Sequence, residues 1–361
     1  MLQQSMSSLK NYIDMSFLKS LSSDLSSASK KFNGKGFLNS VQPQLSKLEL
    51  KERIRLVSTE LGRNISAPYP QQIDILKKAA PKHRGLAGLI FPDFVEVYGQ
   101  EDVTTSLEAL KFFTPFSSAE FAIRPFIEKD PVRLMKVLQK WSRDSDEHIR
   151  RLSSEGSRPR LPWSFKLREF VKDPTPTLAI LEQLKADESL YVRKSVANHL
   201  NDISKDHPDL ALSLAKKWIG QSAHTDWILK HALRTLLKRG DQRALKLFGV
   251  AAAKNVQVAQ LSVVKKKNAI GSSFEFSFII LNKTPQTLRL EYAIHYLKKN
   301  GSYSKKVFKI SEKSVAKGDH KISRRHSLRQ MTTRQHNAGL HKVEVIINGQ
   351  TMMTTDFLVT R

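Results

Sequence analysis

The stretch from Glu147 to Trp163 (EHIRRLSSEGSRPRLPW) concentrates the residue types that can do chemistry. Arg151 and Glu155 are four residues apart, a spacing that places both side chains on one face of a helix. Gly156 is expected to cap the end of that helix, because glycine is favoured there. A carboxylate held near the negative end of a helix and followed by several basic residues is an unusual grouping for a merely solvated turn.

Three further side chains follow this carboxylate: Arg158, Arg160 and Trp163. Guanidinium groups suit phosphate, and an indole face suits a nucleobase or a cation. A structural alternative stays open, in which Glu155 pairs with Arg158 or Arg160 and Trp163 packs on the core. The chemical interpretation predicts a site for a ligand that carries phosphate together with a nucleobase or a cation.

The charge of the chain narrows the class of ligand. Its 361 residues include 60 lysines and arginines against 34 aspartates and glutamates, which gives a formal net charge of +26. Such a chain is expected to bind polyanions by releasing their counterions, and nucleic acid is the commonest such partner. Lipid surfaces and heparin-like polymers remain alternatives. Charge alone therefore predicts a class of partner and no activity.

Cysteine is absent from the chain, which excludes disulfides, thiolate nucleophiles and cysteine-based zinc sites. The absence also fits a reducing cytoplasm. No run of about eighteen apolar residues occurs, so we expect no segment to span a membrane. The first residues lack a basic region followed by an apolar one, and we therefore expect no secretory signal.

The pattern of apolar residues in the first part of the chain predicts marginal helices at first and a clearer helix after them. We expect residues 1–44 to form a serine-rich segment of marginal helices that is mobile around Phe32–Gly36. Residues 46–65 carry leucine and isoleucine at helical spacing, with Gly62 as the expected stop. The first segment contains no chemical motif.

A repeated string marks the starts of later helices. Lys-Asp-Pro or a near copy of it occurs at 129–131, 172–174 and 205–208. Aspartate is a preferred helix N-cap and proline is favoured in the first turn, so each string is expected to begin a helix. Ile149, Val192 and Ile228, in the helices that follow, are separated by 43 and 36 residues. Paired helices with this period predict that residues 45–252 form a solenoid of HEAT-like repeats.

The second helix of each repeat has an apolar and a polar face. Val192 and Val196 belong to one apolar stripe and Ile228 and Ala232 to the next, and we expect both stripes in the core. The other face carries a polar ridge: Arg151, Glu155, Lys194, Asn198, Asp202, Lys230, Arg234 and Lys238. In a curved solenoid this ridge is expected to line the concave surface, which could hold a duplex. The alternative is that the ridge is only the solvated side of each helix.

Residues 253–361 have the alternating, β-rich pattern of strands. The expected strands are 256–264, 272–282, 288–297, 305–311, 341–349 and 351–360. Turn signals fall between them at Asn300-Gly301, Lys317-Gly318 and Asn348-Gly349. About 110 residues of this kind predict an immunoglobulin-like sandwich, which is also basic and could close around nucleic acid. A solubilising cap for the last repeat is the alternative.

Two sequence blocks, SSEGSRPRLPW at 153–163 and VRKSVANHLNDISKDHP at 192–208, accompany these repeats and the β domain. Together they resemble the AlkC branch of the bacterial DNA alkylation repair glycosylases, over roughly residues 45–361. The resemblance implies base excision repair, by cleavage of the N-glycosidic bond of cationic alkylated bases in duplex DNA. The expected bases are 3-methyladenine and 3-methylcytosine, excised without full extrusion from the duplex. We expect a monomer that needs neither a cofactor nor a metal.

The resemblance also assigns roles to individual residues. It makes Glu120, in SSAEFAIRPF, and Glu155 the candidate catalytic carboxylates, and it makes Trp163 an aromatic wall. Residues expected to hold the DNA backbone, or to orient water or sugar, are Arg151, Arg158, Arg160, Lys194, Asn198, Asp202, Lys230 and Arg234. These assignments remain expectations at the level of sequence.

Other interpretations stay open. The related AlkD branch resembles this chain in the spacing of Trp141 and Asp144, so Asp144 competes with the two glutamates for the catalytic role. Glu120 could instead help to begin its own helix. A solenoid that binds nucleic acid without catalysis is the main rival function, and a protein-binding scaffold is the second.

Overall fold

The computed structural model describes residues 9–331 and 335–361. These residues form two compact units. The first extends to His207 and includes Trp218–Ala232, and the second combines Pro208–Lys217 with Leu233–Arg361. The predicted segments 1–44, 45–252 and 253–361 follow changes in sequence pattern, whereas the units reflect packing. The last helices of the predicted solenoid therefore belong with the β domain.

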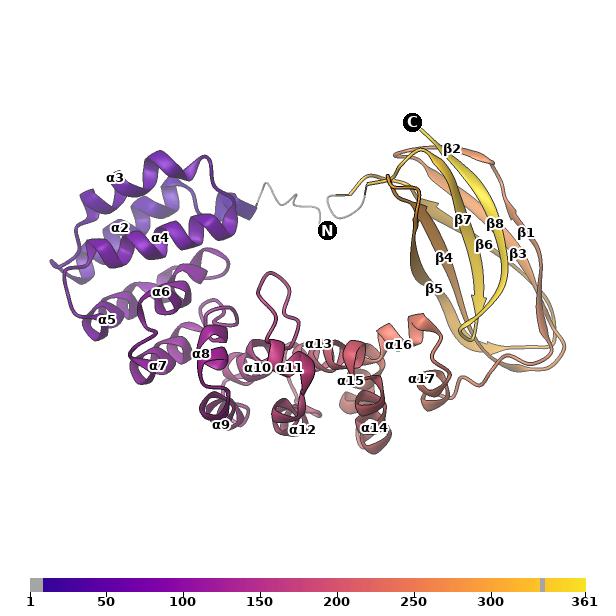
Figure 1. The fold of residues 1–361 in the computed structure, drawn as a ribbon, viewed down its shortest axis with the longest axis horizontal. Helices are drawn as coiled ribbons and strands as arrows, with labels where there is room; N and C mark the ends of the chain where they lie inside the picture. Colours follow the sequence, from indigo (N-terminus) through magenta and orange to yellow (C-terminus); the bar gives the residue numbers. More distant parts are fainter. Residues whose placement is uncertain (1–8, 332–334) are drawn as a thin grey trace. The chain divides into compact units, whose positions relative to one another are not determined.

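Helices that lie side by side make up the first unit (Figure 1). Their bounds are α2 (Met15–Ala28), α3 (Gly34–Leu45), α4 (Leu50–Asn64), α5 (Tyr69–Ala79), α6 (Ile90–Tyr98), α7 (Val103–Phe113), α8 (Arg124–Lys129), α9 (Pro131–Trp141), α10 (Glu147–Gly156), α11 (Arg168–Lys172), α12 (Leu178–Leu184), α13 (Leu190–Asp206) and α15 (Ala223–Ala232). The second unit contains most of α14 (Pro208–Trp218), together with α16 (Arg234–Arg239) and α17 (Gln242–Leu247).

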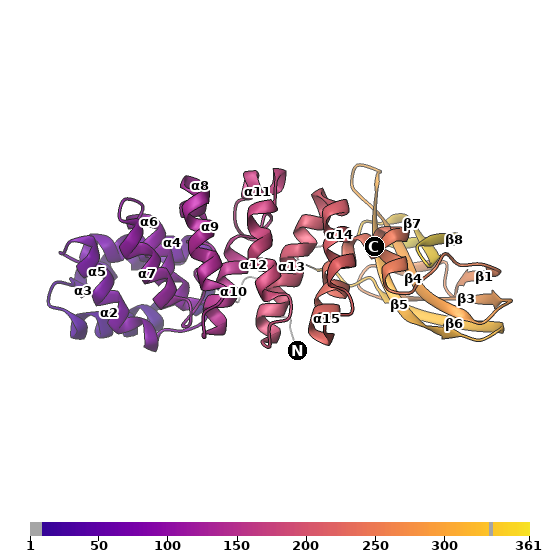
Figure 2. The same ribbon diagram turned by 90° about the horizontal axis from the view of Figure 1, so that it is seen from below.

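The helices of the first unit pack in two layers. In one layer α4 contacts α6, α10 contacts α13, and α13 contacts α15; in the other, α5 contacts α7 and α9 contacts α12. Figure 2 shows α6 to α13 as a row of neighbouring helices. The predicted apolar stripes face this packing, since Val192, Val196, Ile228 and Ala232 are fully buried. The HEAT-like arrangement that the sequence predicts is therefore confirmed.

Residues 9–44, the described part of the predicted N-terminal segment, are better ordered than the sequence predicts, and residues 1–8 lie outside the described residues. Helices α2 and α3 pack on each other, and α2 also packs on α5. Phe32 is buried and its backbone forms a β-bridge with Ile65, so the predicted mobile segment is wrong. Asn33 then begins α3, because its side chain accepts a hydrogen bond from the amide of Gly36. The apolar residues of this short segment suffice to fix it to the helices that follow.

Of three predicted helix signals, Asp130 acts as expected, whereas Asp206 and Gly62 do not. Asp130 caps α9 by accepting from the amide of Arg133, as expected. Asp206, in contrast, ends α13 and pairs with Arg160, so it does not serve as the predicted cap of the next helix. Gly62 lies inside α4, where an added Cβ would approach the Tyr98 ring to 2.3 Å. Close packing, and not helix termination, explains that glycine.

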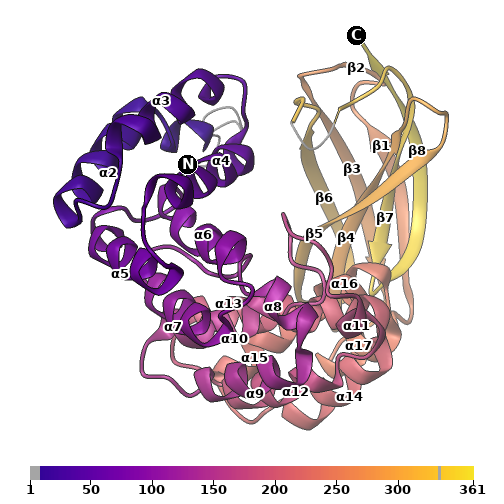
Figure 3. The same ribbon diagram turned by 60° about the vertical axis from the view of Figure 1, so that its left-hand side comes forward.

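The β domain consists of two sheets packed face to face (Figure 3). A three-stranded sheet has the order β1-β3-β6 and a five-stranded sheet the order β2-β8-β7-β4-β5. The strands are β1 (Val256–Val263), β2 (Lys267–Ala269), β3 (Ser273–Asn282), β4 (Gln286–Leu297), β5 (Tyr303–Val315), β6 (Gly318–Ser327), β7 (Gly339–Ile347) and β8 (Gln350–Thr360). Phe276 of β3 and Ile294 of β4 lie in the core between the sheets. The predicted immunoglobulin-like sandwich is confirmed.

Candidate active site

A loop of residues 157–167 leaves the end of α10 and projects from the helices before the chain enters α11 (Figure 1). It carries Trp163, which is 49% exposed. Gly156 ends α10 without a left-handed backbone, so the predicted glycine cap is wrong. An added Cβ there would lie 2.6 Å from Ile123, and glycine is therefore needed for close approach.

Arg124 of α8 fixes both ends of this loop. The side chain is fully buried, and its guanidinium donates to the carbonyl oxygens of Gly156 at 2.9 Å, Arg158 at 2.8 Å and Phe165 at 2.6 Å. Burial, and next the charge of Arg158, lower the pKa of Arg124 to about 10. No carboxylate of the described residues forms an ion pair with it. Only its two terminal nitrogens make these bonds, and its Nε is buried without a hydrogen-bond partner. The structural role of this buried cation is therefore to hold the three carbonyl groups in place.

The loop holds Trp163 in a strained backbone conformation. Its φ is 65°, a value that bulky residues rarely adopt, and the surrounding structure must therefore maintain it. Lys51 of α4 contributes to this, because its ammonium group donates to the carbonyl oxygen of Trp163. The same ammonium lies 4.8 Å from the centroid of the Phe121 ring. The indole is thus presented to solvent by contacts with its backbone.

The two candidate carboxylates meet at one arginine. Arg151 forms an ion pair with Glu120 and a second one, at 3.5 Å, with Glu155. Ser118 joins this group: its hydroxyl lies 2.8 Å from both Glu120 and Arg151. Burial lowers the pKa of Arg151, but the charges of the two glutamates outweigh it and raise the pKa overall. The guanidinium between the carboxylates offsets their mutual repulsion.

A second arginine extends this charge cluster into the interior. Arg158 donates to Glu155 at 2.7 Å and to Asp202 at 2.9 Å, and Asp202 also pairs with Lys205 at 2.9 Å. Glu155 and Arg158 are each 6% exposed, and Asp202 is 1% exposed. Glu155 and Asp202 therefore belong neither to the open polar ridge that the sequence predicts nor to a solvated helix side, which was the alternative. The physical reason is that the chain after α10 folds back and places Arg158 over both carboxylates.

Each candidate carboxylate uses a single oxygen in these contacts. Glu120 is engaged through Oε2 and Glu155 through Oε1. Within the described part of the chain, the other oxygen of each side chain has no hydrogen bond or ion pair. Buried carboxylates usually have their oxygens satisfied, so the two open oxygens are the groups that a water molecule or a ligand would meet.

His199 lies beside this cluster but is not available as a base. It is fully buried, and its Nδ1 lies 2.9 Å from the carbonyl oxygen of Ser154. Burial, and next the charge of Arg158, lower the pKa of its imidazole to about 3. The ring is therefore neutral and packs against the helix that carries Glu155.

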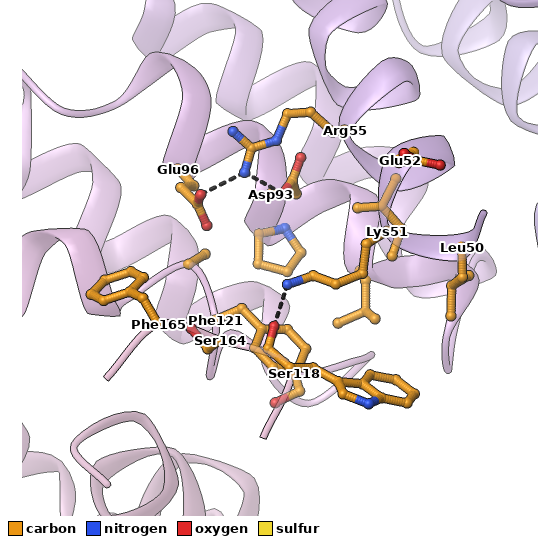
Figure 4. A pocket seen from close by; sticks show the side chains of 15 residues that line it. Leu50, Lys51, Glu52, Arg55, Asp93, Glu96, Ser118, Phe121, Ser164 and Phe165 are labelled. Atoms are coloured by element: carbon orange, nitrogen blue, oxygen red, sulfur yellow. Dashed lines mark hydrogen bonds and ion pairs between the residues drawn. The ribbon is translucent and has the colours of Figure 1, made fainter. Parts of the chain in front are cut away.

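A pocket of about 590 Å³ meets the charge cluster at Ser118. Figure 4 shows the side chains that line it. Three of its aromatic wall residues, Phe121, Trp163 and Phe165, come from the loop or from the segment before α8. Ser118 also lines it, and this residue connects the pocket with Glu120 and Arg151. The aromatic wall predicted at Trp163 thus faces a cavity with further aromatic side chains.

The far side of this pocket carries charged residues that the sequence reading missed. Arg55 of α4 donates to Asp93 at 2.9 Å and to Glu96 at 2.5 Å, both on α6 (Figure 4). Burial raises the pKa of Asp93 and of Glu96 despite the neighbouring arginine. The available signal was the pair of carboxylates in the apolar string FPDFVEVYGQ, where a charged residue in a buried helix requires a partner.

The remaining predicted contact residues lie in different settings. Arg160 binds Asp206 through two hydrogen bonds of 2.6 and 2.7 Å. Lys194 is exposed and Asn198 half-buried on α13, and Lys230 is exposed on α15. Arg234 begins α16, in the second compact unit. Of the predicted set, the structure therefore brings together Glu120, Arg151, Glu155, Arg158 and Asp202, next to Trp163 in the adjoining pocket.

The competing aspartate lies elsewhere. Asp144 pairs with Lys111 at 2.7 Å and lines a separate groove between α7 and α9, together with Trp141. Trp141 is 7% exposed. Neither residue lines the pocket of Trp163. Their spacing in sequence does not bring them to the glutamate cluster.

Among the described residues, no group of three or more histidine, aspartate or glutamate side chains lies close enough together to hold a metal ion. Nor is any helix among these residues long and apolar enough to cross a bilayer. The chemistry available at the site is that of carboxylates, arginines and aromatic rings.

Comparison with known proteins identifies relatives of the whole chain. Residues 112–236 match the family model described as DNA alkylation repair enzyme, and residues 257–361 match the C-terminal Ig-like domain of YhaZ. Protein YhaZ of Bacillus subtilis (strain 168), described as uncharacterized, is 45% identical over 356 residues, which cover 98% of this chain and 100% of the relative.

A solved structure agrees with this relationship. Alkylpurine DNA glycosylase AlkC of Pseudomonas fluorescens, bound to DNA containing an abasic site analog, is 43% identical. It superposes with a TM-score of 0.94 over 98% of this chain and 99% of AlkC. This coverage exceeds the predicted range of 45–361 and extends the likeness into the N-terminal segment. The chain therefore belongs to the AlkC-type family of DNA alkylation repair proteins.

Proposed function

We propose that this protein is a DNA glycosylase that releases cationic N-alkylated bases, 3-methyladenine and 3-methylcytosine, from duplex DNA. The observation that carries the proposal is the cluster in which Glu120 and Glu155 share Arg151 and each keeps one open oxygen beside an aromatic pocket. Membership of the AlkC-type family supports the same reaction class.

The protein does not need to donate a proton to the base in this reaction. A base alkylated on a ring nitrogen is already cationic, so the electron pair of the N-glycosidic bond neutralises it as the bond breaks. The sugar is left with positive charge at its anomeric carbon. Water then adds to that carbon and loses a proton, which gives the abasic sugar. A nearby carboxylate stabilises the cationic sugar and accepts the proton, and no cofactor is needed.

The geometry supports a division of roles. Glu155, which Arg151 and Arg158 hold through one oxygen, would use the other oxygen to direct the water or to stabilise the sugar cation. Glu120, held in the same way by Arg151, is the second carboxylate. Trp163 would place its indole face against the cationic base, where a cation–π contact is favourable.

The buried placement of two residues changes their proposed role. Arg158 and Asp202 were expected to contact DNA or to orient its sugar, but both are buried and each engages the other. We propose that they position Glu155 and do not touch phosphate. Phosphate contacts are proposed instead for the exposed cations Lys194 and Lys230. The net charge of +26 supports binding to duplex DNA. A monomer is proposed to carry out the reaction.

An assay of base release tests the proposed function. The full chain is incubated with duplex DNA containing 3-methyladenine or 3-methylcytosine, and the free base is measured by chromatography, with binding to the same duplex measured in parallel. Release of the free base, with abasic sites left in an intact strand, is the expected result. Tight binding without release would contradict the proposal and favour the rival, a solenoid that binds nucleic acid without catalysis.

A further inference from the structure

The pocket beside Trp163 is lined by aromatic and acidic side chains, whereas the chain as a whole is basic. We propose that it binds the methylated base after the base has left the sugar, as a product site. The inference rests on the proposed function, because the base reaches the pocket only if the bond is cleaved. The residues that carry it are Phe121 and Trp163 on the aromatic side and Glu96 on the charged side.

The charge of the lining argues against a phosphate ligand. Three carboxylates line the pocket, Glu52, Asp93 and Glu96, against two cations, Lys51 and Arg55. This net negative lining contrasts with a formal charge of +26 for the whole chain. Phosphate would be repelled by it, whereas a neutral heterocycle with amino groups would not.

The two cations are also already engaged. Arg55 is held by Asp93 and Glu96, and Lys51 donates to the carbonyl oxygen of Trp163. Neither is left as a dedicated anion site. Glu96 uses Oε1 for Arg55, and its other oxygen has no partner in the described part of the chain. An exocyclic amino group, present on both adenine and cytosine, is the donor that such an oxygen accepts from.

Aromatic side chains supply the second requirement of a nucleobase site. Phe121 and Phe165 lie on one side of the pocket in Figure 4, and Arg55, Asp93 and Glu96 lie on the other. A planar base can stack on such rings, and stacking tolerates different bases. The volume of about 590 Å³ falls in the range of roughly 300–1,000 Å³ that is typical of small-molecule sites.

The position of the pocket gives a released base a short route to it. Trp163 and Ser118 line it, and Ser118 contacts both Glu120 and Arg151 of the charge cluster. Ser118 therefore borders both the pocket and the proposed site of cleavage. A base that leaves the sugar there would move past the indole into the aromatic and acidic pocket.

Binding of the free base tests this inference without DNA. The full chain is titrated with 3-methyladenine by isothermal titration calorimetry, and the same base is added to the release assay as an inhibitor. Glu96→Gln removes the accepting charge and retains the shape of the side chain. Glu101→Gln is the matched control, because its side chain is 92% exposed and lies outside the pocket. Phe121→Leu is a second variant that removes a stacking face and keeps an apolar side chain.

The expected result is saturable binding to the wild type and to Glu101→Gln. Glu96→Gln is expected to bind about tenfold more weakly, because a charge-assisted hydrogen bond is lost. Phe121→Leu is expected to bind more weakly too, with both variants melting as cooperatively as the wild type. Wild-type protein that releases base from DNA but binds no free base would overturn the product site, as would unchanged affinity in both variants. Binding of the free base by a protein that releases none from DNA would support the pocket and contradict the proposed function.

Discussion

Two buried carboxylates, one in each unit, differ in how completely their oxygens are satisfied. Glu344 of β7 accepts from Lys305 at 2.8 Å and from Thr351 through Oε1, and it lies 2.5 Å from His295 through Oε2. Glu155 of α10 is engaged through Oε1 alone. Both side chains are at most 8% exposed. The two side chains are therefore buried to a similar extent, and they differ in that Glu155 has one oxygen without a partner.

The difference separates a structural from a chemical carboxylate. Hydrogen bonds from Lys305, Thr351 and His295 outweigh burial and lower the pKa of Glu344. A fully satisfied carboxylate of this kind stabilises the fold and offers nothing to a ligand. Glu155 is held equally firmly by its arginines and still has an oxygen that can act on water or on a sugar cation. Four sets of substitutions test this comparison.

The largest effect is expected for Glu155→Gln. Loss of the charge at the open oxygen should reduce single-turnover base release by a factor of about 100 to 10,000, the range typical of general acid–base groups. Glu120→Gln should have a smaller effect of the same sign, because Glu120 is the second carboxylate. Asp144→Asn is the control, since Asp144 lines another groove, and it should release base at the wild-type rate.

Arg124→Lys should give the next largest effect. Lysine cannot reach the three carbonyl oxygens of Gly156, Arg158 and Phe165 with the geometry of a guanidinium, so the loop that carries Trp163 should shift. A displacement of about 1 Å can reduce catalysis roughly 100-fold. The rate of release at saturating protein should fall while the affinity for undamaged duplex stays the same. An equal loss of both would indicate general misfolding and remove Arg124 from its positioning role.

Glu344→Gln should affect stability and leave base release unchanged. We expect a loss of about 1–3 kcal/mol in the free energy of unfolding, because a charged group with several hydrogen bonds is removed. The lowered pKa of Glu344 sets the pH dependence. Stabilisation is present above the ordinary value of 4.5 and is lost as the pH falls through the lower folded value. Urea titrations of wild type and variant should therefore differ most above pH 4.5 and converge in more acidic solution.

The smallest effect is expected for exposed cations. Lys194→Gln should weaken binding to any duplex slightly and reduce the slope of log affinity against log salt by about one, as for the loss of a phosphate contact. Arg158→Met should leave that slope unchanged, because the side chain is buried between Glu155 and Asp202. The sequence analysis had placed Arg158 among the expected contacts to DNA, for which the slope would become shallower. A shallower slope in Arg158→Met would restore the original assignment.

Periodic features could be predicted from the sequence. The stripes of Val192, Val196 and Ile228 are buried as predicted, because helical spacing reports which face is apolar. Strands with buried alternate residues were likewise identified. Strand β6 was missed, since it lies at the edge of the three-stranded sheet and has few buried residues. A polar edge strand gives little periodic signal, and its partner β3 defines it.

Contacts that form only because the chain folds back on itself after α10 could not be predicted. Glu155 and Asp202 were expected on an open polar ridge, because the sequence does not show that Arg158 folds back over both. Arg124 was overlooked for the same reason: nothing near it in SSAEFAIRPF indicates that three carbonyls from 156–165 surround it. Local pattern thus identified Glu155 and Trp163 as candidates, the family resemblance added Glu120, and tertiary structure was needed to find what holds them.

The central claim is that the half-satisfied carboxylates of the helical unit act on the sugar of an alkylated nucleotide. The most direct measurement is the single-turnover rate of 3-methyladenine release from duplex DNA, at saturating protein, for the wild type, Glu155→Gln, Glu120→Gln and Glu344→Gln. We predict that release is lost in Glu155→Gln, reduced in Glu120→Gln and unchanged in Glu344→Gln, with duplex binding retained in all. Wild-type release rates in both Glu155→Gln and Glu120→Gln would contradict the account.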